Sequence, residues 1–219
     1  MPIERASAER DRGGAATRAR ILEAAERVVR ERGLARATTK EIARAAGCSE
    51  AALYKHYADK SEIVLAMITS RPGGFPQHLA GLRDQAGTLD VEATLTDLAE
   101  RAVDFFARAM PVGNALLAEP DLLARYRERL AVRGSGPRTP VTRLADYLRA
   151  ERDRGRIRQD ADPDAAAALL LGACFHTAFL GVFLGDLAAT AGERGAEVKT
   201  FARNTVSTLM LALAPRGAG

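Results

Sequence analysis

Residues 38–60 read TTKEIARAAGCSEAALYKHYADK, and this stretch decides the fold. Its first part predicts a helix, because Thr38 is a good N-cap and Glu41 can complete a capping box with it. The glycine that follows ends this helix, and Ser49 can cap a second short helix over residues 50–57. Two helices joined by a short glycine-containing turn are typical of a helix-turn-helix, in which the second helix lies in the major groove of DNA.

The residues of this motif fall into two chemical sets. One set is apolar and spaced to hold the two helices at a fixed angle: Ile42, Ala46, Cys48, Leu53 and Tyr57. The other set offers hydrogen-bond donors that suit phosphate oxygens and base edges: Thr39, Tyr54, Lys55, His56 and Lys60. Two of these residues have a plainer alternative, since Tyr54 can be a packing residue between domains and His56 an ordinary surface histidine.

The segments on either side of the motif complete a small helical module. A helix is expected from Thr17, with its apolar residues on one face, and Gly33 ends it. The polar residues 1–16 before it are expected to be a flexible arm. After the motif, Asp59-Lys60-Ser61-Glu62 resembles a second capping box and predicts a linking helix up to residue 71.

The rest of the chain, residues 75–219, predicts a second and larger helical domain. Ala, Arg, Leu and Glu dominate the sequence, and runs rich in Val, Ile and Thr are nearly absent, so the fold is expected to be all-α with about nine helices. Asp162 followed by Pro163 gives a sharp helix start. The helices expected in this region cover residues 91–110, 120–132, 140–154, 163–185 and 196–213.

Residues 165–185 are nearly free of charge and long enough to cross a bilayer. Much of the segment is Ala and Gly, His176 sits at its centre, and no basic cluster flanks it. These features favour a helix buried in a bundle or an oligomer interface. A small membrane-associated helical protein is the alternative.

The charge is unevenly distributed along the chain. Residues 1–60 carry 13 basic and 9 acidic side chains, whereas the other 159 residues carry 19 of each. A basic terminal module on a neutral body is expected of a protein that binds a polyanion, although an ordinary solvated surface has a similar composition.

Several other functions lack a motif in this sequence. There is no Gly-x-Ser-x-Gly elbow and no phosphate loop, and the three histidines, at 56, 78 and 176, lack metal-ligand spacing. We therefore expect neither an enzyme nor a cofactor. The charged start of the chain lacks an apolar signal core, so we expect a cytoplasmic protein in which Cys48 and Cys174 are free thiols.

Residues 17–70 resemble the DNA-binding domain of the TetR family of bacterial transcription regulators. The segments TRARILEAAERVVRERG (17–33) and TTKEIARAAGCSEAALYKHYADKSEIV (38–64) carry the resemblance. Its most characteristic part is a Gly-x-Ser turn followed by Leu-Tyr, a His-aromatic pair and a lysine three residues later. Further on, GRIRQDADPDAAAALLLGA (155–173) is typical of many members.

This resemblance implies a role for several residues of the motif. Thr39, Tyr54, His56 and Lys60 fall where the family contacts phosphates. Ser49, Glu50, Ala51, Ala52 and Lys55 fall where the second helix faces the groove. The chain departs from the family at two of these places, with alanine at 51 for the usual glycine and alanine at 52 for a hydroxyl residue. Glu50 could accept only from a cytosine N4 amine or face solvent, and we expect it to face solvent. Tyr57, in place of the usual phenylalanine, is expected to keep its ring in the core.

The resemblance also implies a larger function. Such proteins are homodimers that bind a palindromic double-stranded DNA operator, most often as repressors, and a small molecule releases them. Here the dimer would form through residues 163–185 and 196–213, and the effector is expected to be largely apolar. A helical ligand-binding dimer without DNA binding is the other alternative. The candidate pocket residues are Phe105, Phe106, Met110, Asn114, Leu117, Tyr126, Tyr147, Cys174, His176 and Thr177.

Overall fold

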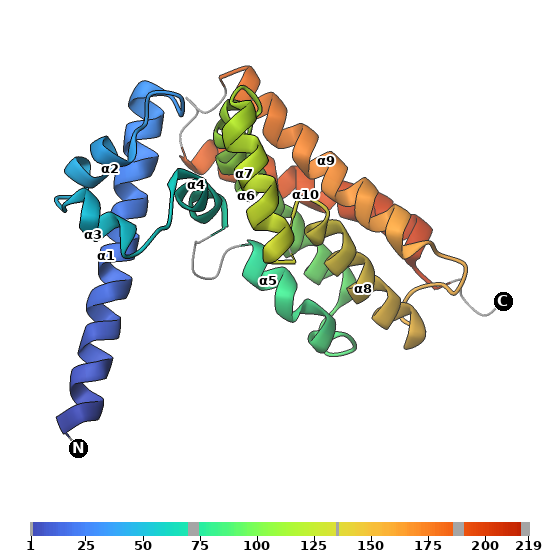
Figure 1. Cartoon of the computed structure of the whole chain (residues 1–219). Coiled ribbons are helices and arrows are strands. Elements are labelled where there is room, and N and C mark those ends of the chain that lie inside the picture. The colour runs from blue at the N-terminus through green and yellow to red at the C-terminus, as the bar shows by residue number, and fades with distance from the viewer. Residues whose placement is uncertain (1, 70–74, 135, 186–190, 216–219) are drawn as a thin grey trace. The chain divides into compact units, whose positions relative to one another are not determined.

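The computed structural model describes residues 2–69, 75–134, 136–185 and 191–215 (Figure 1). Within these ranges every element of regular structure is helical, with ten α-helices and one short 3-10 helix. This confirms the all-α fold. The chain divides into two compact units: unit 1 comprises Met1–Ser70 and Pro111–Gly134, and unit 2 comprises Arg71–Met110 and Ser135–Gly219. Residues 111–134, which the sequence assigned to the larger C-terminal domain, therefore cluster with the N-terminal unit.

Unit 1 is built on one long helix. Helices α2 (Thr39–Ala45) and α4 (Lys60–Thr69) both pack against α1 (Pro2–Arg32). Helix α3 (Glu50–Tyr54) contacts α2. On its other side α4 packs against α7 (Pro120–Val132). Two apolar clusters form the core of this unit. The first contains Ile21, Ala24, Ala25, Val28, Ala37, Ile42, Ala43, Ala46, Leu53, Tyr57, Ile63 and Ala66. The second contains Leu34, Val64, Val112, Leu116 and Leu122.

The first helix begins earlier than expected. We predicted a flexible arm over residues 1–16, and the structure instead continues the helix back to Pro2. Proline is favoured at the first helical position, and the Ala, Arg and Glu residues that follow are strong helix formers. Gly13 and Gly14 sit in open space and have negative φ angles, so the helix passes through them.

The capping residues of the motif lie where the sequence predicted them. Thr38 accepts a hydrogen bond from the Glu41 backbone N–H, and the Glu41 carboxylate accepts one from the Thr38 N–H, so the capping box is complete. Ser49 caps α3 by accepting from the Ala52 N–H. The third helix is shorter than the predicted span 50–57, because Lys55 is already its C-cap.

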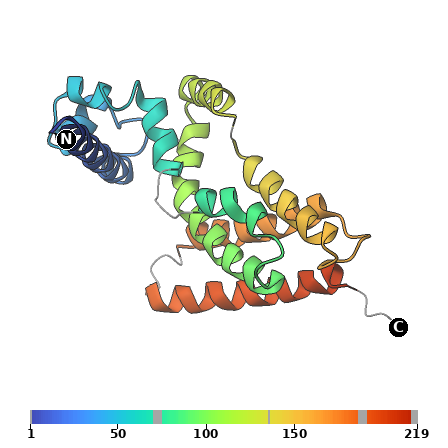
Figure 2. The same cartoon turned by 90° about the horizontal axis from the view of Figure 1, so that it is seen from below.

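Unit 2 contains α5 (Phe75–Leu82), the 3-10 helix η1 (Arg83–Gln85), the first 20 residues of α6 (Val91–Leu117), α8 (Thr139–Asp153), α9 (Pro163–Phe183) and α10 (Ala191–Leu213). Helix α8 lies at the centre, where it packs against α5, η1 and α9, and α9 packs against α10. Figure 2 shows α10, in red, as a long helix along this unit. The core includes Phe75, Leu79, Leu95, Leu98, Leu144, Tyr147, Leu148, Leu170, Leu171, Cys174 and Val206.

Most helix positions in unit 2 and α7 agree with prediction. The Asp162 side chain accepts from the backbone N–H groups of Asp164 and Ala165, which confirms the predicted start of α9. Two differences are informative. Helix α5 was not predicted, and α6 continues beyond residue 110 through Pro111. Proline usually interrupts a helix because it lacks an N–H donor, and Pro111 is the residue at which the chain passes from unit 2 to unit 1. The predicted end of the linking helix, at residue 71, lies outside the described residues.

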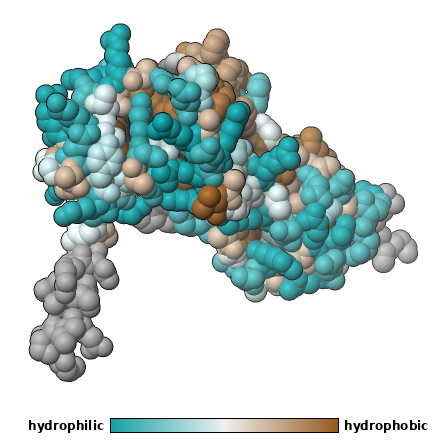
Figure 3. Space-filling view, in the orientation of Figure 1, coloured by the Kyte–Doolittle hydropathy of each residue, from teal (hydrophilic) through white to brown (hydrophobic). Residues whose placement is uncertain are grey.

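Helix α9 is apolar on more than its core side. It is the one helix in the described part of the chain that is long and apolar enough to cross a membrane, by length and composition alone. Only 33% of its most apolar window is buried within the chain. Apolar residues of α9 therefore remain on the surface, where Figure 3 shows brown side chains gathered near the end of this helix.

Candidate nucleic-acid interface

Two arginines of α1 fix the orientation of α2. The Arg20 Nε donates to the Ala46 carbonyl at 3.0 Å, and an Arg27 Nη donates to the Ala45 carbonyl at 3.0 Å. The last carbonyls of a helix have no partner inside it and carry partial negative charge, so a guanidinium is a favourable partner there. Gly47 then turns the chain with a φ of 65°, a conformation that suits glycine.

One face of α3 is anchored in the core of unit 1. Leu53 of α3 and Tyr57, in the turn after α3, are fully buried, which confirms the packing role predicted for both. The Tyr57 hydroxyl donates to the Arg18 carbonyl at 3.3 Å, and the Arg18 guanidinium lies 4.6 Å from the centre of the Tyr57 ring. Burial raises the pKa of Tyr57, so this hydroxyl remains a donor at neutral pH. Because one side of α3 packs into the core of unit 1, the other side can face a partner.

The opposite face of α3 is exposed. Tyr54 has 49% of its surface accessible, and Lys55, Ala51 and Ser49 are exposed too, while Ala52 is half-buried. His56, in the turn after α3, is half-buried. Polar and small side chains therefore alternate along a surface that a groove of DNA could meet.

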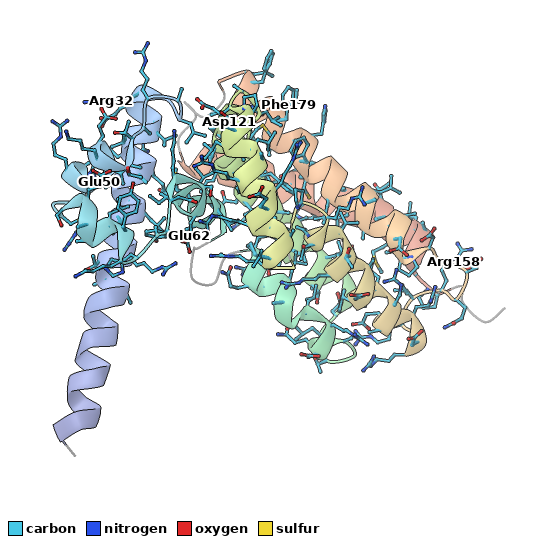
Figure 4. All side chains as sticks on the ribbon, viewed as in Figure 1. Arg32, Glu50, Glu62, Asp121, Arg158 and Phe179 are labelled. Atoms are coloured by element: carbon cyan, nitrogen blue, oxygen red, sulfur yellow. The ribbon has the colours of Figure 1, made fainter. Side chains whose placement is uncertain are left out.

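Three residues of the motif form a chain of hydrogen bonds. The Thr39 hydroxyl donates to Glu50 Oε1 at 2.7 Å, and the Tyr54 hydroxyl lies 3.2 Å from the same Thr39 oxygen. Glu50 is labelled in Figure 4, beside α2 and α3. We expected Glu50 to face solvent, and the structure shows it half-buried, with its carboxylate accepting this hydroxyl from the start of α2.

Lys60 is held differently from the other predicted phosphate contacts. Its Nζ donates to the Leu34 carbonyl at 2.6 Å, and burial lowers its pKa. The ammonium thus ties the start of α4 to the loop after α1. Because an ammonium has three donors, two remain for other partners.

The start of α4 is bound by arginines of α7. Arg129 donates to Asp59 Oδ2 at 2.6 Å and to the Ser61 hydroxyl at 2.7 Å, while Arg133 lies 3.3 Å from Glu62. Burial raises the pKa of Asp59, but hydrogen bonds from Arg129, Ser61 and the Glu62 N–H outweigh it and bring the pKa to about 2. This arginine clamp, formed by Arg129 and Arg133, fixes the segment that follows α3.

The second predicted capping box forms only in part. The Glu62 backbone N–H donates to Asp59 Oδ1 at 3.0 Å, as predicted. The Glu62 carboxylate accepts from the Ala58 N–H at 2.8 Å instead of the Asp59 N–H. The Glu62 side chain thus bonds one residue before the predicted cap. Its other oxygen, Oε1, pairs with Arg133 of the arginine clamp.

In unit 2, four phenylalanines from three helices form one aromatic cluster. Phe105 and Phe106 of α6 lie 5.5 Å apart, centre to centre. Phe75 of α5 is 5.2 Å from Phe105, and Phe175 of α9 is 5.5 Å from Phe106. Ring centres at these separations are in favourable contact. We predicted Phe105 and Phe106 as pocket residues, and the structure places Phe75 and Phe175 in contact with them.

The other predicted pocket residues are scattered. Met110, Tyr147 and Cys174 are buried in unit 2, where burial raises the pKa of the Cys174 thiol to about 12, and Thr177 is half-buried. Three belong to unit 1: Asn114 and Leu117 are exposed, and Tyr126 is half-buried. His176, also predicted as a pocket residue, is exposed on α9. Its neighbours on the core side of the helix are Cys174 and Ala178.

A buried polar group supports the end of α8. The Glu151 carboxylate, fully buried, accepts from the Gly87 N–H at 3.0 Å and lies 3.4 Å from the Arg156 Nε. Burial raises the pKa of the nearby Tyr147 hydroxyl. Among the described residues, no group of three or more His, Cys, Asp or Glu side chains is arranged to hold a metal ion.

Comparison with known proteins gives two family matches. Residues 21–67 match the model described as "Bacterial regulatory proteins, tetR family", and residues 118–213 match "AefR-like transcriptional repressor, C-terminal domain". The chain belongs to the TetR family of bacterial transcription regulators.

Two curated TetR-like relatives come from Pseudomonas putida. The transcriptional regulator ArpR is 48% identical over 74 residues, which is 34% of this chain and 35% of ArpR. TtgR is 48% identical over 54 residues, which is 25% of this chain and 26% of TtgR. The matched segments thus span about a third or less of each relative. These relatives are named as transcription regulators and not as enzymes.

A solved structure covers nearly the whole chain. The complex of SmeT with triclosan is 25% identical, with a TM-score of 0.65, and the match covers 92% of this chain and 93% of that one. SmeT is described as the repressor of the multidrug efflux pump SmeDEF of Stenotrophomonas maltophilia. The TetR fold therefore extends over both units.

The TetR pattern located the helix-turn-helix but not the residues that support it. Arg129 and Arg133 went unnoticed because they lie about 70 positions beyond their partners, on a helix assigned to the other domain. The available signal was a pair of arginines four residues apart on a predicted helix, which lie on one face. Nothing in that spacing indicates which acids they meet.

Proposed function

We propose that this TetR-family protein is a ligand-responsive transcriptional repressor that binds a palindromic operator as a homodimer. The observation that carries this proposal is the two-sided character of α3. Leu53 is fully buried, while the next two residues, Tyr54 and Lys55, are exposed. A helix held rigidly on one side and offering donors on the other suits insertion into the major groove.

The DNA contacts divide by chemistry. Phosphate oxygens would be met by the hydroxyls of Thr39 and Tyr54, by His56, and by the two free donors of Lys60. Base edges would be met by the α3 residues that face the groove: Ser49, Ala51, Ala52 and Lys55. The alanine methyls suit contact with thymine methyl groups, and the Lys55 ammonium suits guanine O6 and N7.

The dimer would form through α9 and α10. Gly172 and Gly181 have open space above them, so a second helix can approach closely. Large apolar side chains of α9 are exposed around them, with Phe179 labelled in Figure 4; they are Leu169, Phe175, Phe179, Leu180 and Phe183. A two-fold axis here would present two reading helices to two half-sites of a palindrome.

The effector would be a largely apolar small molecule bound in unit 2. The aromatic cluster of Phe75, Phe105, Phe106 and Phe175 gives a surface that suits such a ligand, and polar groups nearby would orient it. The complex of SmeT with triclosan, itself a small apolar phenol, supports this class of effector. As a DNA-binding regulator, the protein would act in the cytoplasm.

A mobility-shift assay tests this function. The full chain would be mixed with labelled DNA from the region upstream of its own gene, in excess unlabelled random DNA. We expect a discrete shift that Lys55→Ala weakens by roughly tenfold to a hundredfold, as for loss of a base contact. Arg83→Ala, which removes an exposed basic side chain from η1, an element separate from α3 and from the proposed dimer helices, is the control and should bind like wild type. A dimer that gives no shift would favour the alternative of a ligand-binding protein without DNA binding.

A further inference from the structure

Glu50 is an acidic residue on the face of α3 that would approach a polyanion. It lies in the first turn of this helix, beside the exposed Ser49 and Ala51. Among the described residues, no lysine, arginine or histidine forms an ion pair with it; its Oε1 is hydrogen-bonded to the Thr39 hydroxyl. Its negative charge is therefore not neutralised by a neighbouring side chain, although DNA phosphates would repel it.

The directions of the hydrogen bonds follow from proton counting. An ionised carboxylate only accepts, so the single Thr39 hydroxyl proton goes to Glu50 at 2.7 Å. The Thr39 oxygen must then accept from the Tyr54 hydroxyl, 3.2 Å away. The free protein thus commits the donors of both hydroxyls to a chain that ends on Glu50.

A DNA phosphate needs the same two protons. Phosphate and carboxylate oxygens are both anionic acceptors, and hydroxyl donors bind either in the same way. Thr39 and Tyr54 can donate to a phosphate only if the chain to Glu50 opens. The carboxylate and the DNA backbone therefore compete for one set of donors.

From this competition we propose that Glu50 stands in for a DNA phosphate in the free protein and sets the selectivity of binding. The inference rests on the proposed function. On random DNA, opening the chain leaves Glu50 without a donor and close to phosphates, so binding is weakened. If the operator has a cytosine opposite Glu50, its N4 amine can donate a hydrogen bond to the carboxylate in place of Thr39. Glu50 therefore weakens binding to random DNA more than binding to the operator.

The test compares two duplexes by fluorescence anisotropy of the full chain. One is a random-sequence duplex of about 30 base pairs, enough for two half-sites, and the other is the upstream fragment. Glu50→Gln removes the charge and keeps the shape. We expect it to bind the random duplex about three- to tenfold more tightly, with a smaller gain on the upstream fragment, so that the specificity ratio falls.

A matched control separates local from general charge effects. Glu31→Gln removes one negative charge from an exposed position of α1, in the same unit. It should change binding of either duplex by less than about twofold, because its charge is exposed and screened by salt. An equal gain from Glu31→Gln and Glu50→Gln would overturn the proposal.

A double-mutant cycle tests the hydroxyl chain itself. Glu50→Ala removes the acceptor as well as the charge, and Thr39→Val removes the hydroxyl at constant shape. If the carboxylate competes for the Thr39 proton, the gain from Glu50→Ala shrinks in the Thr39→Val background. An undiminished gain would mean that charge acts alone and would overturn the competition.

Failure of this inference can be distinguished from failure of the proposed function. If wild type binds neither duplex and Lys55→Ala changes nothing, DNA binding itself is refuted. If wild type binds and Lys55→Ala weakens binding, but Glu50→Gln binds the random duplex no more tightly, only the role of Glu50 is refuted. Thermal unfolding of each variant, measured in parallel, ensures that only folded proteins are compared.

Discussion

The first turns of α3 and α4 contain similar residues and behave differently. Each holds a serine and a glutamate close to the helix start, yet the acids of α4 meet guanidinium groups and the acid of α3 meets hydroxyls. Asp59 and Glu62 are bound by the arginine clamp of α7, at 2.6 Å and 3.3 Å. In the part of the chain that the structure describes, Glu50 is bound by the Thr39 hydroxyl, at 2.7 Å.

We call the contact of the arginine clamp with Asp59 and Glu62, at the start of α4, the fixed junction. We call the contact of Thr39 with Glu50, at the start of α3, the exchangeable junction. An ion pair with a guanidinium leaves no net charge and supplies two or more directed hydrogen bonds, so the start of α4 is held in place. A hydroxyl that donates to a carboxylate can donate to another anion instead, and the Glu50 carboxylate it leaves is only half-buried. The α4 junction therefore positions the motif, while the α3 junction can respond to DNA.

The largest effect on stability should come from breaking the fixed junction. Arg129→Ala removes the donor to Asp59 Oδ2 and the donor to the Ser61 hydroxyl, so we expect a loss of about 2 kcal/mol in the free energy of unfolding, as for hydrogen bonds to charged groups. Urea unfolding measures it. Glu50→Ala should lose less than about 0.5 kcal/mol beyond the weak helix-dipole contribution. Equal losses in the two variants would show that the junctions do not differ in this way.

Acid should remove the stability that the ionised Asp59 carboxylate contributes at the fixed junction. The pKa of Asp59 is about 2 in the folded protein, below its ordinary value of 3.8. The unfolded chain therefore takes up the proton first, and the contribution is complete above pH 4 and is lost as the pH falls from about 4 to about 2. Asp59 is partly exposed, so we expect about 1–2 kcal/mol after allowing for screening by solvent. Asp59→Asn should lower stability at pH 7 and flatten the profile in this window.

The smallest effect should come from the exchangeable junction. Tyr54→Phe removes the hydroxyl that donates to Thr39 and would donate to a phosphate. We expect stability within about 0.5 kcal/mol of wild type and DNA binding weaker by about threefold to fivefold, as for one hydrogen bond. Anisotropy titrations and urea unfolding of the same samples measure both. A loss of stability without a loss of binding would place Tyr54 in packing, the alternative raised by the sequence.

The local features were predictable because they depend on residues near in sequence. The caps at Thr38, Ser49 and Asp162 bind N–H groups two or three positions away, so short patterns were sufficient. The burial of Leu53 and Tyr57 followed from helical spacing.

Contacts between distant segments were not predictable in this way. Lys60 reaches the Leu34 carbonyl, 26 positions away, and the arginine clamp spans about 70 positions. His176 was predicted as a pocket residue, but a helix that is apolar on several sides, as α9 is, does not reveal which side its own chain covers. Glu50 was assigned to solvent because only the fold brings the start of α2 against the start of α3.

The salt dependence of binding by the wild-type chain tests DNA recognition by the helix-turn-helix most directly. Affinity for the upstream fragment would be measured over a series of salt concentrations, with Lys55→Ala in parallel. If the exposed face of α3 and the donors around it meet phosphates, the logarithm of affinity falls steeply with the logarithm of salt, by about 4 or more per decade for a dimer. Binding that is absent at low salt, or that does not change with salt, would contradict recognition of DNA by this surface.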